Sequence, residues 1–123
     1  MSGGTAGDLL NNGTTMVMAP GNGYDVAGSG FEPLGVPVSA GTLANLRAAV
    51  SPAPGGAETI DVDVLVNGVG SGIGCTITGA GTTCNDLVNT FSASDGDLVT
   101  VEAVSSGGAN DAKVSFSLTH SVP

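Results

Sequence analysis

Few residues in this 123-residue chain could do acid–base or nucleophilic chemistry. The chain has one histidine, His120, and two cysteines, Cys75 and Cys84. A catalytic centre needs a base, an acid or a nucleophile held together in a cleft. His120 falls on the apolar register of an expected strand near the end of the sequence, and neither cysteine has a basic neighbour that would favour a reactive thiolate. We therefore predict no catalytic residues and no enzyme.

The carboxylates are scattered along the sequence rather than grouped. Asp61 and Asp63 alternate along one expected strand, so they share a face and cannot flank a glycosidic bond. Asp95 and Asp97 surround a glycine, an ordinary way to end a strand because Asp bonds to nearby backbone. Calcium takes about six to eight oxygen ligands, and this short turn is not an EF-hand loop. We expect no metal and no cofactor.

A glycine-rich run at residues 68–74 (GVGSGIG) has the superficial look of a phosphate-binding loop. No helix is expected after it and no lysine lies within it, so the context that a dinucleotide site requires is missing. We interpret the run as a wide hairpin loop.

The composition excludes whole classes of partner. Charged residues make up 11% of the chain, the net charge is −9, and the only cations of Lys and Arg type are Arg47 and Lys113. Binding to nucleic acid phosphates or to anionic lipid needs clusters of basic residues. No apolar run approaches the ~20 residues of a membrane span, and the N-terminus lacks the features of a secretory signal. So few charges suggest that much of the surface lies against partners.

Apolar residues recur with a period of two through most of the sequence, which is typical of strands. The clearest strand is Thr59–Asn67, and Asn67-Gly68 after it suits a type I′ turn. Residues 31–38 carry two prolines and are expected as an edge strand or an irregular extended segment. Further strands are expected at residues 14–19, 42–50, 73–77, 87–93, 98–104 and 112–120.

These strands predict one all-β domain. Turn signals recur every ~8–12 residues, a spacing that indicates an antiparallel β-sandwich or jelly roll. The alternation predicts which side chains form the core: Ile60, Val62, Val64, Val66, Val99, Val101, Val114, Phe116 and Leu118. Continuous valine faces and few charges also predict association, which we expect to be a homotrimer.

Cys75 and Cys84 could face each other across a hairpin. That pairing leaves Gly79-Ala80 as a two-residue loop, and glycine in the first position suits a type II′ turn. A cross-strand disulfide fits if the pair is a non-hydrogen-bonded one. Two buried free thiols are the alternative, and a metal site is weaker because no second cysteine pair or paired histidines accompany them. An oxidised pair would imply an extracellular location.

The N-terminal segment has a different character. Residues 1–13 are small, polar and glycine-rich, so we expect a flexible arm, followed by a single sandwich domain at residues 14–123. The arm is either a frayed terminus or a segment that orders on a partner. In the second case Leu9 and Leu10 would fill a pocket on a particle.

Four segments give a resemblance to a known group. Gly41–Leu46 (GTLANL), Thr59–Gly68, Cys75–Cys84 and Gly96–Val101 follow one another in a characteristic order. The chain resembles small bacteriophage and bacterial proteins with a TNF/C1q-like jelly roll over roughly residues 30–120. That resemblance implies a homotrimer without catalytic residues, on a phage capsid or fibre or on a cell or spore surface.

We therefore expect a virion structural protein of a bacteriophage, of the capsid decoration, accessory or fibre-head type. Its partners would be itself and a major capsid or other virion protein, with no nucleic acid and no membrane. It would be assembled in the host cytoplasm and lie on the surface of the extracellular particle. The alternative is a lectin-like or adhesive surface module of a bacterial cell or spore, since jelly rolls often hold sugars at loop ends. Sugar stacking favours aromatic residues, and the chain has one tyrosine and no tryptophan.

Overall fold

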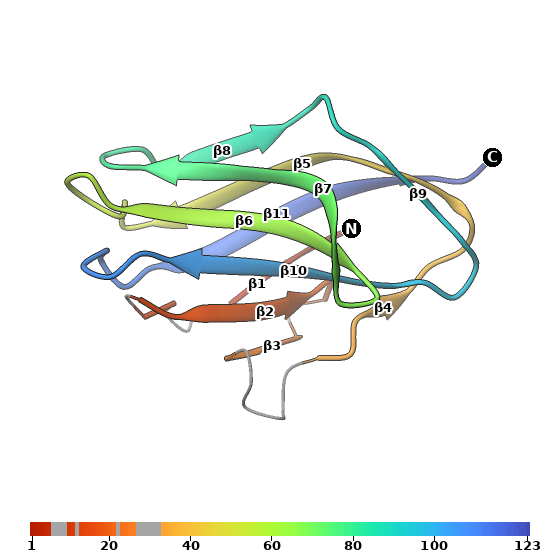
Figure 1. Cartoon of the computed structure of the whole chain (residues 1–123), viewed down its shortest axis with the longest axis horizontal. Coiled ribbons are helices and arrows are strands. Elements are labelled where there is room, and N and C mark those ends of the chain that lie inside the picture. The colour runs from red at the N-terminus through yellow and green to blue at the C-terminus, as the bar shows by residue number, and fades with distance from the viewer. Residues whose placement is uncertain (6–9, 12, 22, 27–32) are drawn as a thin grey trace.

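The computed structural model describes residues 1–5, 10–11, 13–21, 23–26 and 33–123. This part of the chain is all-β and contains no helix. Figure 1 shows its strands: β1 (Ser2–Gly4), β2 (Thr15–Ala19), β3 (Gly23–Val26), β4 (Val36–Pro37), β5 (Gly41–Ser51), β6 (Thr59–Val66), β7 (Val69–Thr78), β8 (Thr83–Asp86), β9 (Phe91–Ala93), β10 (Leu98–Ser105) and β11 (Lys113–Ser121).

The strands form two antiparallel sheets with jelly-roll connections. The first, which we name the β5 sheet, has the order β1-β11-β5-β8, with β9 also on β5. The second, the β6 sheet, has the order β3-β2-β10-β6-β7, with β4 also on β10. The first strand therefore lies beside the last, and the chain crosses between the two sheets after β1, β4, β5, β7, β9 and β10, which is typical of a jelly roll. The predicted jelly-roll sandwich is confirmed, whereas the narrower TNF/C1q-like assignment stays a prediction.

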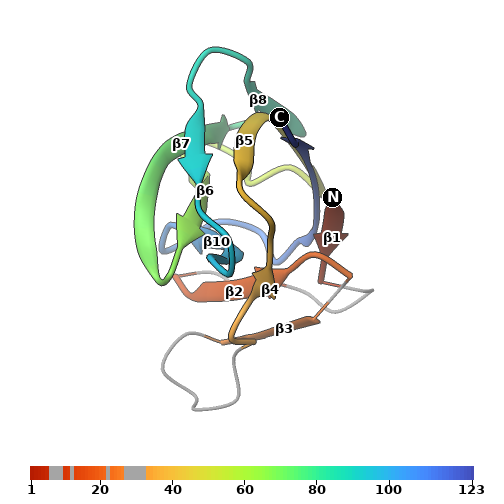
Figure 2. The same ribbon diagram turned by 90° about the vertical axis from the view of Figure 1, so that its right-hand side faces the viewer.

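The two sheets face each other across a core of aliphatic side chains. Seen along the strands, β7 lies next to β8 on one side of the sandwich and β1 lies near β2 on the other (Figure 2). Alternation in β6 places every second residue inward, because successive side chains of a strand point to opposite faces. All nine predicted core residues are buried: Ile60, Val62, Val64, Val66, Val99, Val101, Val114, Phe116 and Leu118.

A bulge interrupts the alternation in β5. Leu43 and Leu46 are both buried although they are three residues apart. Between them Asn45 has a φ of 56°, and the register with β11 shifts at this point. The extra residue of a β-bulge restores the inward direction of the later side chains, and Asn tolerates the left-handed conformation better than most residues.

The glycine-rich run is not a wide loop, so that interpretation is wrong. The loop is only Asn67-Gly68, whose φ angles of 53° and 79° confirm the predicted type I′ turn. The rest of the run belongs to β7, where a bulge opposes β6. Ser71 bridges it: its hydroxyl donates to the Val64 carbonyl at 2.7 Å and accepts the Ile73 N–H at 3.2 Å. That side chain replaces a ladder bond that the sequence pattern could not reveal.

The N-terminus differs from the predicted flexible arm. Within the described residues, Ser2–Gly4 forms β1, and Leu10 is fully buried while exchanging backbone hydrogen bonds with Ala112. A Cβ on Gly3 would lie 2.6 Å from the Ala19 carbonyl oxygen and 3.0 Å from the Phe116 ring. Glycine here permits close packing rather than mobility. Leu10 is therefore unavailable to a partner, and Leu9 lies outside the described residues.

The first prediction concerns Phe116, which is 4% exposed and packs beneath β1. Phe116→Ala should lower the free energy of unfolding by roughly 3–5 kcal/mol, because it removes buried apolar area and leaves a cavity. Denaturant titration measures the loss. The neighbouring exposed Ser115 provides the control, since Ser115→Ala should change stability by no more than about 0.5 kcal/mol. Equal effects of the two substitutions would contradict this packing.

Candidate functional site

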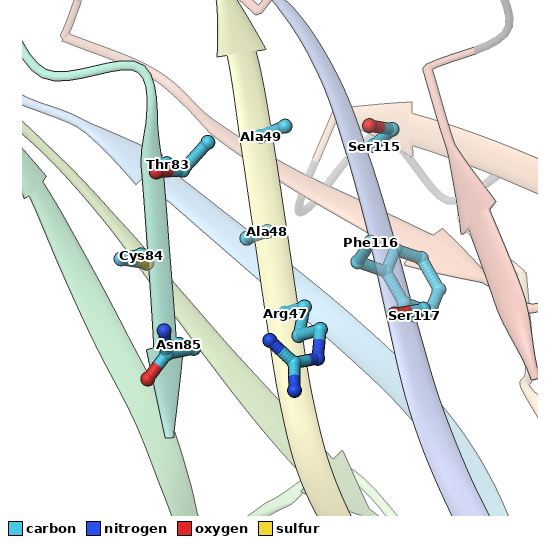
Figure 3. Close-up of a pocket in the computed structure, with 9 residues that line it drawn as sticks. All are labelled: Arg47, Ala48, Ala49, Thr83, Cys84, Asn85, Ser115, Phe116 and Ser117. Atoms are coloured by element: carbon cyan, nitrogen blue, oxygen red, sulfur yellow. The ribbon is translucent and has the colours of Figure 1, made fainter. Parts of the chain in front are cut away.

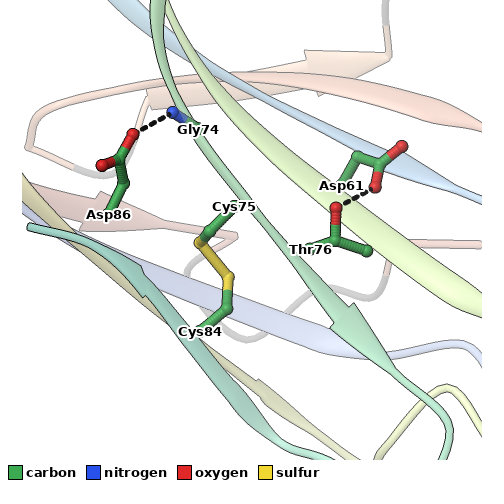
Figure 4. Close-up of a disulfide and its surroundings, with 6 residues drawn as sticks. All are labelled: Asp61, Gly74, Cys75, Thr76, Cys84 and Asp86. Carbon is green, nitrogen blue, oxygen red and sulfur yellow. Dashed lines mark hydrogen bonds between the residues drawn. A yellow bond between two sulfur atoms is a disulfide. The ribbon is translucent and has the colours of Figure 1, made fainter. Parts of the chain in front are cut away.

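One seam between the sheets is closed by a disulfide. Cys75 of β7 and Cys84 of β8 are bonded, with a Cα–Cα distance of 5.8 Å (Figure 4). The predicted pairing is confirmed, but the predicted hairpin is wrong. The turn is present, since Gly81 N–H donates to the Thr78 carbonyl at 3.0 Å, yet β8 then pairs with β5 instead of β7. The bond therefore joins the two sheets, because each strand finds its ladder partner in a different one.

A buried carboxylate reinforces the same seam. Asp86, 7% exposed, accepts hydrogen bonds from the backbone N–H groups of Gly74, Val88 and Asn89 and from the Asn89 side-chain amide, at 2.9–3.1 Å. Figure 4 shows the bond from Gly74. The bonds from Asn89, its backbone N–H first, hold the pKa of the Asp86 carboxyl well below its ordinary value. The bond to Gly74 crosses from β8 to β7.

Sequence reasoning missed Asp86 as a structural residue. The available signal was an Asp followed three residues later by Asn, a pattern that suits a side-chain-closed turn. The same turn explains why the strand predicted at residues 87–93 is reduced to Phe91–Ala93.

The outer side of the β5 sheet carries a shallow polar depression, which we name the Arg47 face. In the ladder, Arg47 lies between Asn85 of β8 and Ser117 of β11. The depression has a volume of about 420 Å³. Figure 3 shows the residues that line it. Its outward side chains are Arg47, Ala49, Thr83, Asn85, Ser115 and Ser117.

The polar side chains of this face are not used by the fold. Within the part of the chain that the structure describes, none of Arg47, Asn85 and Ser117 has a side-chain hydrogen-bond partner. Lys113 lies farther along β11 on the same outward register, so both Lys and Arg cations of the chain lie on one side of the sandwich. Such a face can donate several hydrogen bonds to an acidic surface.

The outer side of the β6 sheet is acidic. Asp63 of β6 pairs in the ladder with Glu102 of β10, and Asp61 lies two residues along on the same face. Beside them is a depression of about 360 Å³ that we name the Asp63 hollow, lined by Asp63, Leu65, Gly70, Ser71, Gly72 and Glu102 among others. The space above Gly70 and Gly72 is free, because a Cβ added at either residue would meet nothing within 4 Å.

The carboxyl groups of this face differ in environment. Asp61 accepts a hydrogen bond from the Thr76 hydroxyl at 2.6 Å (Figure 4). Partial burial, followed by the negative charge of Asp61, raises the pKa of the Asp63 carboxyl. Asp63 also lies against Gly74, where an added Cβ would collide with its carboxylate oxygen. The Asp63 hollow is therefore a place where a cation from outside would be favourable.

The remaining residues considered from the sequence have structural contacts. His120 is half-buried, with Nε2 2.9 Å from the Ser39 carbonyl oxygen, to which that nitrogen donates. Asp95 accepts the Ala40 N–H at 2.7 Å, and Asp97 accepts the Ser94 N–H at 2.8 Å. Asp97 closes its own turn, as the sequence predicted, whereas Asp95 instead binds the backbone just before β5.

Two kinds of feature are absent from the described residues. No group of three or more His, Cys, Asp or Glu side chains there could hold a metal ion. No helix in that part is long and apolar enough to cross a membrane.

Comparison with known proteins places this chain in no family. No family model matches the sequence, and no curated protein matches it. One similar solved structure is the carbohydrate-binding module CBM36 in complex with calcium and xylotriose. It is 18% identical, covers 98% of this chain and 99% of its own, and superposes with a TM-score of 0.45. At that similarity it carries no argument about what this chain binds.

The second prediction concerns the disulfide. Replacing Cys75 and Cys84 together by alanine should lower the free energy of unfolding by about 2–3 kcal/mol, because the bond closes a short loop and restricts the unfolded chain. Chemical denaturation of the variant and of the unreduced wild type measures the difference. Adding reductant should destabilise the wild type and leave the double variant unchanged. Equal stability of the two oxidised proteins would contradict a stabilising bond.

The third prediction is a pH dependence. The folded-state pKa of Asp86 is lowered, so its carboxylate stabilises the fold above the ordinary value of 3.8, and this contribution is lost as the pH falls through the folded value. Asp86→Asn should cost about 1–3 kcal/mol at pH 7. The gap to wild type should shrink as the pH approaches 2. Denaturation across that pH range measures it, with exposed Asp95→Asn as the control; a gap that stays constant would contradict the account.

Proposed function

We propose that the chain is a virion structural protein of a bacteriophage, a decoration or fibre-head subunit that binds its particle through exposed apolar side chains of the sandwich. The observation that supports this is their distribution. Among the described residues, the exposed large hydrophobic side chains are Leu34, Val69, Leu87, Val88 and Val122.

These exposed apolar side chains lie toward one end of the sandwich. They adjoin β4, the β6–β7 turn, the end of β8 and the end of β11, toward the side where the C-terminus lies in Figure 1. In the described chain, the connections at the other end, residues 52–58, 79–82 and 106–112, expose no large hydrophobic side chain. An uneven distribution of this kind favours a docking role, because exposed apolar area that gathers on one part of a surface often marks an interface.

The Leu87-Val88 pair is the best prepared of these for binding. Val88 is 85% exposed and Leu87 48% exposed. Asp86 accepts the backbone N–H of Val88 at 3.1 Å, and the disulfide at Cys84 fixes the strand just before the pair. A segment already held in one conformation loses little conformational entropy on binding, so its apolar burial contributes more fully to affinity.

Attachment through the sandwich replaces attachment through the N-terminal arm. Leu10 is inside the core and cannot fill a pocket on another protein. The disulfide suits the extracellular life of a released particle. A lectin-like module is the weaker alternative, because no described aromatic ring is fully exposed: Phe116 is buried, and Tyr24 and Phe91 are half-buried.

The fourth prediction tests this proposal. When the purified chain is added to particles that have been prepared without it, it should sediment with them. The double variant Leu87→Ser, Val88→Ser should bind at least about tenfold more weakly, because burying each of these side chains contributes roughly 1.5–3 kcal/mol. Ala80→Ser, in the exposed β7–β8 turn, is the matched control and should bind as wild type.

Two results would count against it. Undiminished binding of the double variant would move the contact elsewhere on the sandwich. A wild-type chain that never sediments with particles would overturn the virion assignment itself.

A further inference from the structure

We propose that copies of this chain associate head to tail, with the Arg47 face of one copy against the Asp63 hollow of the next. This contact goes beyond the particle docking proposed above and does not depend on it. It uses the two outer sheet faces, whereas the docking proposal uses the exposed apolar side chains.

The two faces carry opposite charge. Arg47 and Lys113, the only Lys and Arg residues of the chain, both lie on the outer side of the β5 sheet. Asp61, Asp63 and Glu102 lie on the outer side of the β6 sheet. Because the sheets pack through their inner faces, these outer faces point in opposite directions and cannot neutralise each other within one copy. A second copy supplies the cation that the acidic face lacks.

The shapes of the two faces also match. On the Arg47 face the long guanidinium side chain is surrounded by the short residues Ala49, Ser115 and Ser117, which allow another backbone to approach. The Asp63 hollow is open above Gly70, where a side chain is missing. Arg47 of one copy can therefore enter the hollow of its neighbour.

The chemistry at the bottom of the hollow favours arginine. A planar guanidinium can bind a carboxylate through two parallel hydrogen bonds, which a lysine ammonium cannot do. Asp63 and Glu102 are ladder partners, so their carboxylates offer two such acceptors on adjacent strands. A guanidinium bound to Asp63 would also offset the repulsion between the carboxylates of Asp63 and Asp61, which lie on the same strand face.

Overall repulsion between copies does not forbid the contact. Each chain carries a net charge of −9, which opposes approach at long range. At an ionic strength of ~0.15 M the screening length is about 8 Å, so distant charges are largely screened while paired charges in contact are not. The association is therefore expected at physiological salt.

The contact joins two different surfaces, so it is heterologous. Such contacts close into a ring when the rotation between successive copies permits, and otherwise extend as a chain of copies. The homotrimer expected from the sequence corresponds to a ring of three. Measuring the mass of the assembly distinguishes the two forms.

The experiment is light scattering with purified protein at ~0.15 M salt. Wild type should have the mass of several chains at micromolar concentration, and Arg47→Glu should raise the dissociation constant at least tenfold. Asp63→Lys should do the same, with Glu102→Lys as a second variant in case the first does not fold. Lys113→Glu is the matched control: it makes the same charge change on the same face, four ladder positions from Arg47, and should shift the constant less than threefold.

Mixing the variants gives the sharpest result. Neither Arg47→Glu nor Asp63→Lys should associate alone, but an equimolar mixture should, because each variant supplies the face that the other has lost. Wild type with the mass of one chain throughout this range, or two folded variants that fail to associate when mixed, would overturn the inference. An Arg47→Glu protein that keeps its mass but no longer sediments with particles would assign the face to a particle protein and overturn it too.

Discussion

The structure depends on burying the apolar inner faces of two sheets against each other. A jelly roll made this way leaves two seams where the sheets meet, and each is closed by a different device. At the β7–β8 seam the Cys75–Cys84 bond and the Asp86–Gly74 hydrogen bond cross between sheets. At the other seam β1 pairs with β11, and the Ser2 carbonyl accepts the Gly21 N–H at 2.9 Å. These contacts hold the two sheets together at both seams.

The contacts that close the seams also influence which groups the outer surface of the sandwich presents. With the apolar faces buried, the described surface carries carboxylates at turns and on the outer side of the β6 sheet, together with a few exposed apolar side chains. Asp86 illustrates the connection: the hydrogen bonds that close the seam also hold the backbone of Val88, an exposed apolar residue. The same residues thus stabilise the sandwich and fix the geometry of the surface that we assign to docking.

The alternation of apolar residues in the sequence predicted which side chains point inward, but it did not predict which strands pair with each other. Alternation in β6, β10 and β11 identified the inward residues, because direction along a strand follows directly from spacing. It could not show that β7 and β8 join different sheets, since alternation specifies a face and not a ladder partner. The β1 strand was missed because Gly3 and Gly4 have no side chains to alternate. Of the candidate site, the cysteine pair was predicted, whereas the Arg47 face appeared only when three strands were placed side by side.

We propose that this chain acts by contact, as a fixed component of a particle. The most direct test is quantitative mass spectrometry of particles purified through a density gradient from the protein's own source. We predict that the chain migrates with the particle band at a constant molar ratio to the major shell protein in every fraction of that band. A chain found only in the soluble fractions at the top of the gradient, with none in the particle band, would contradict it.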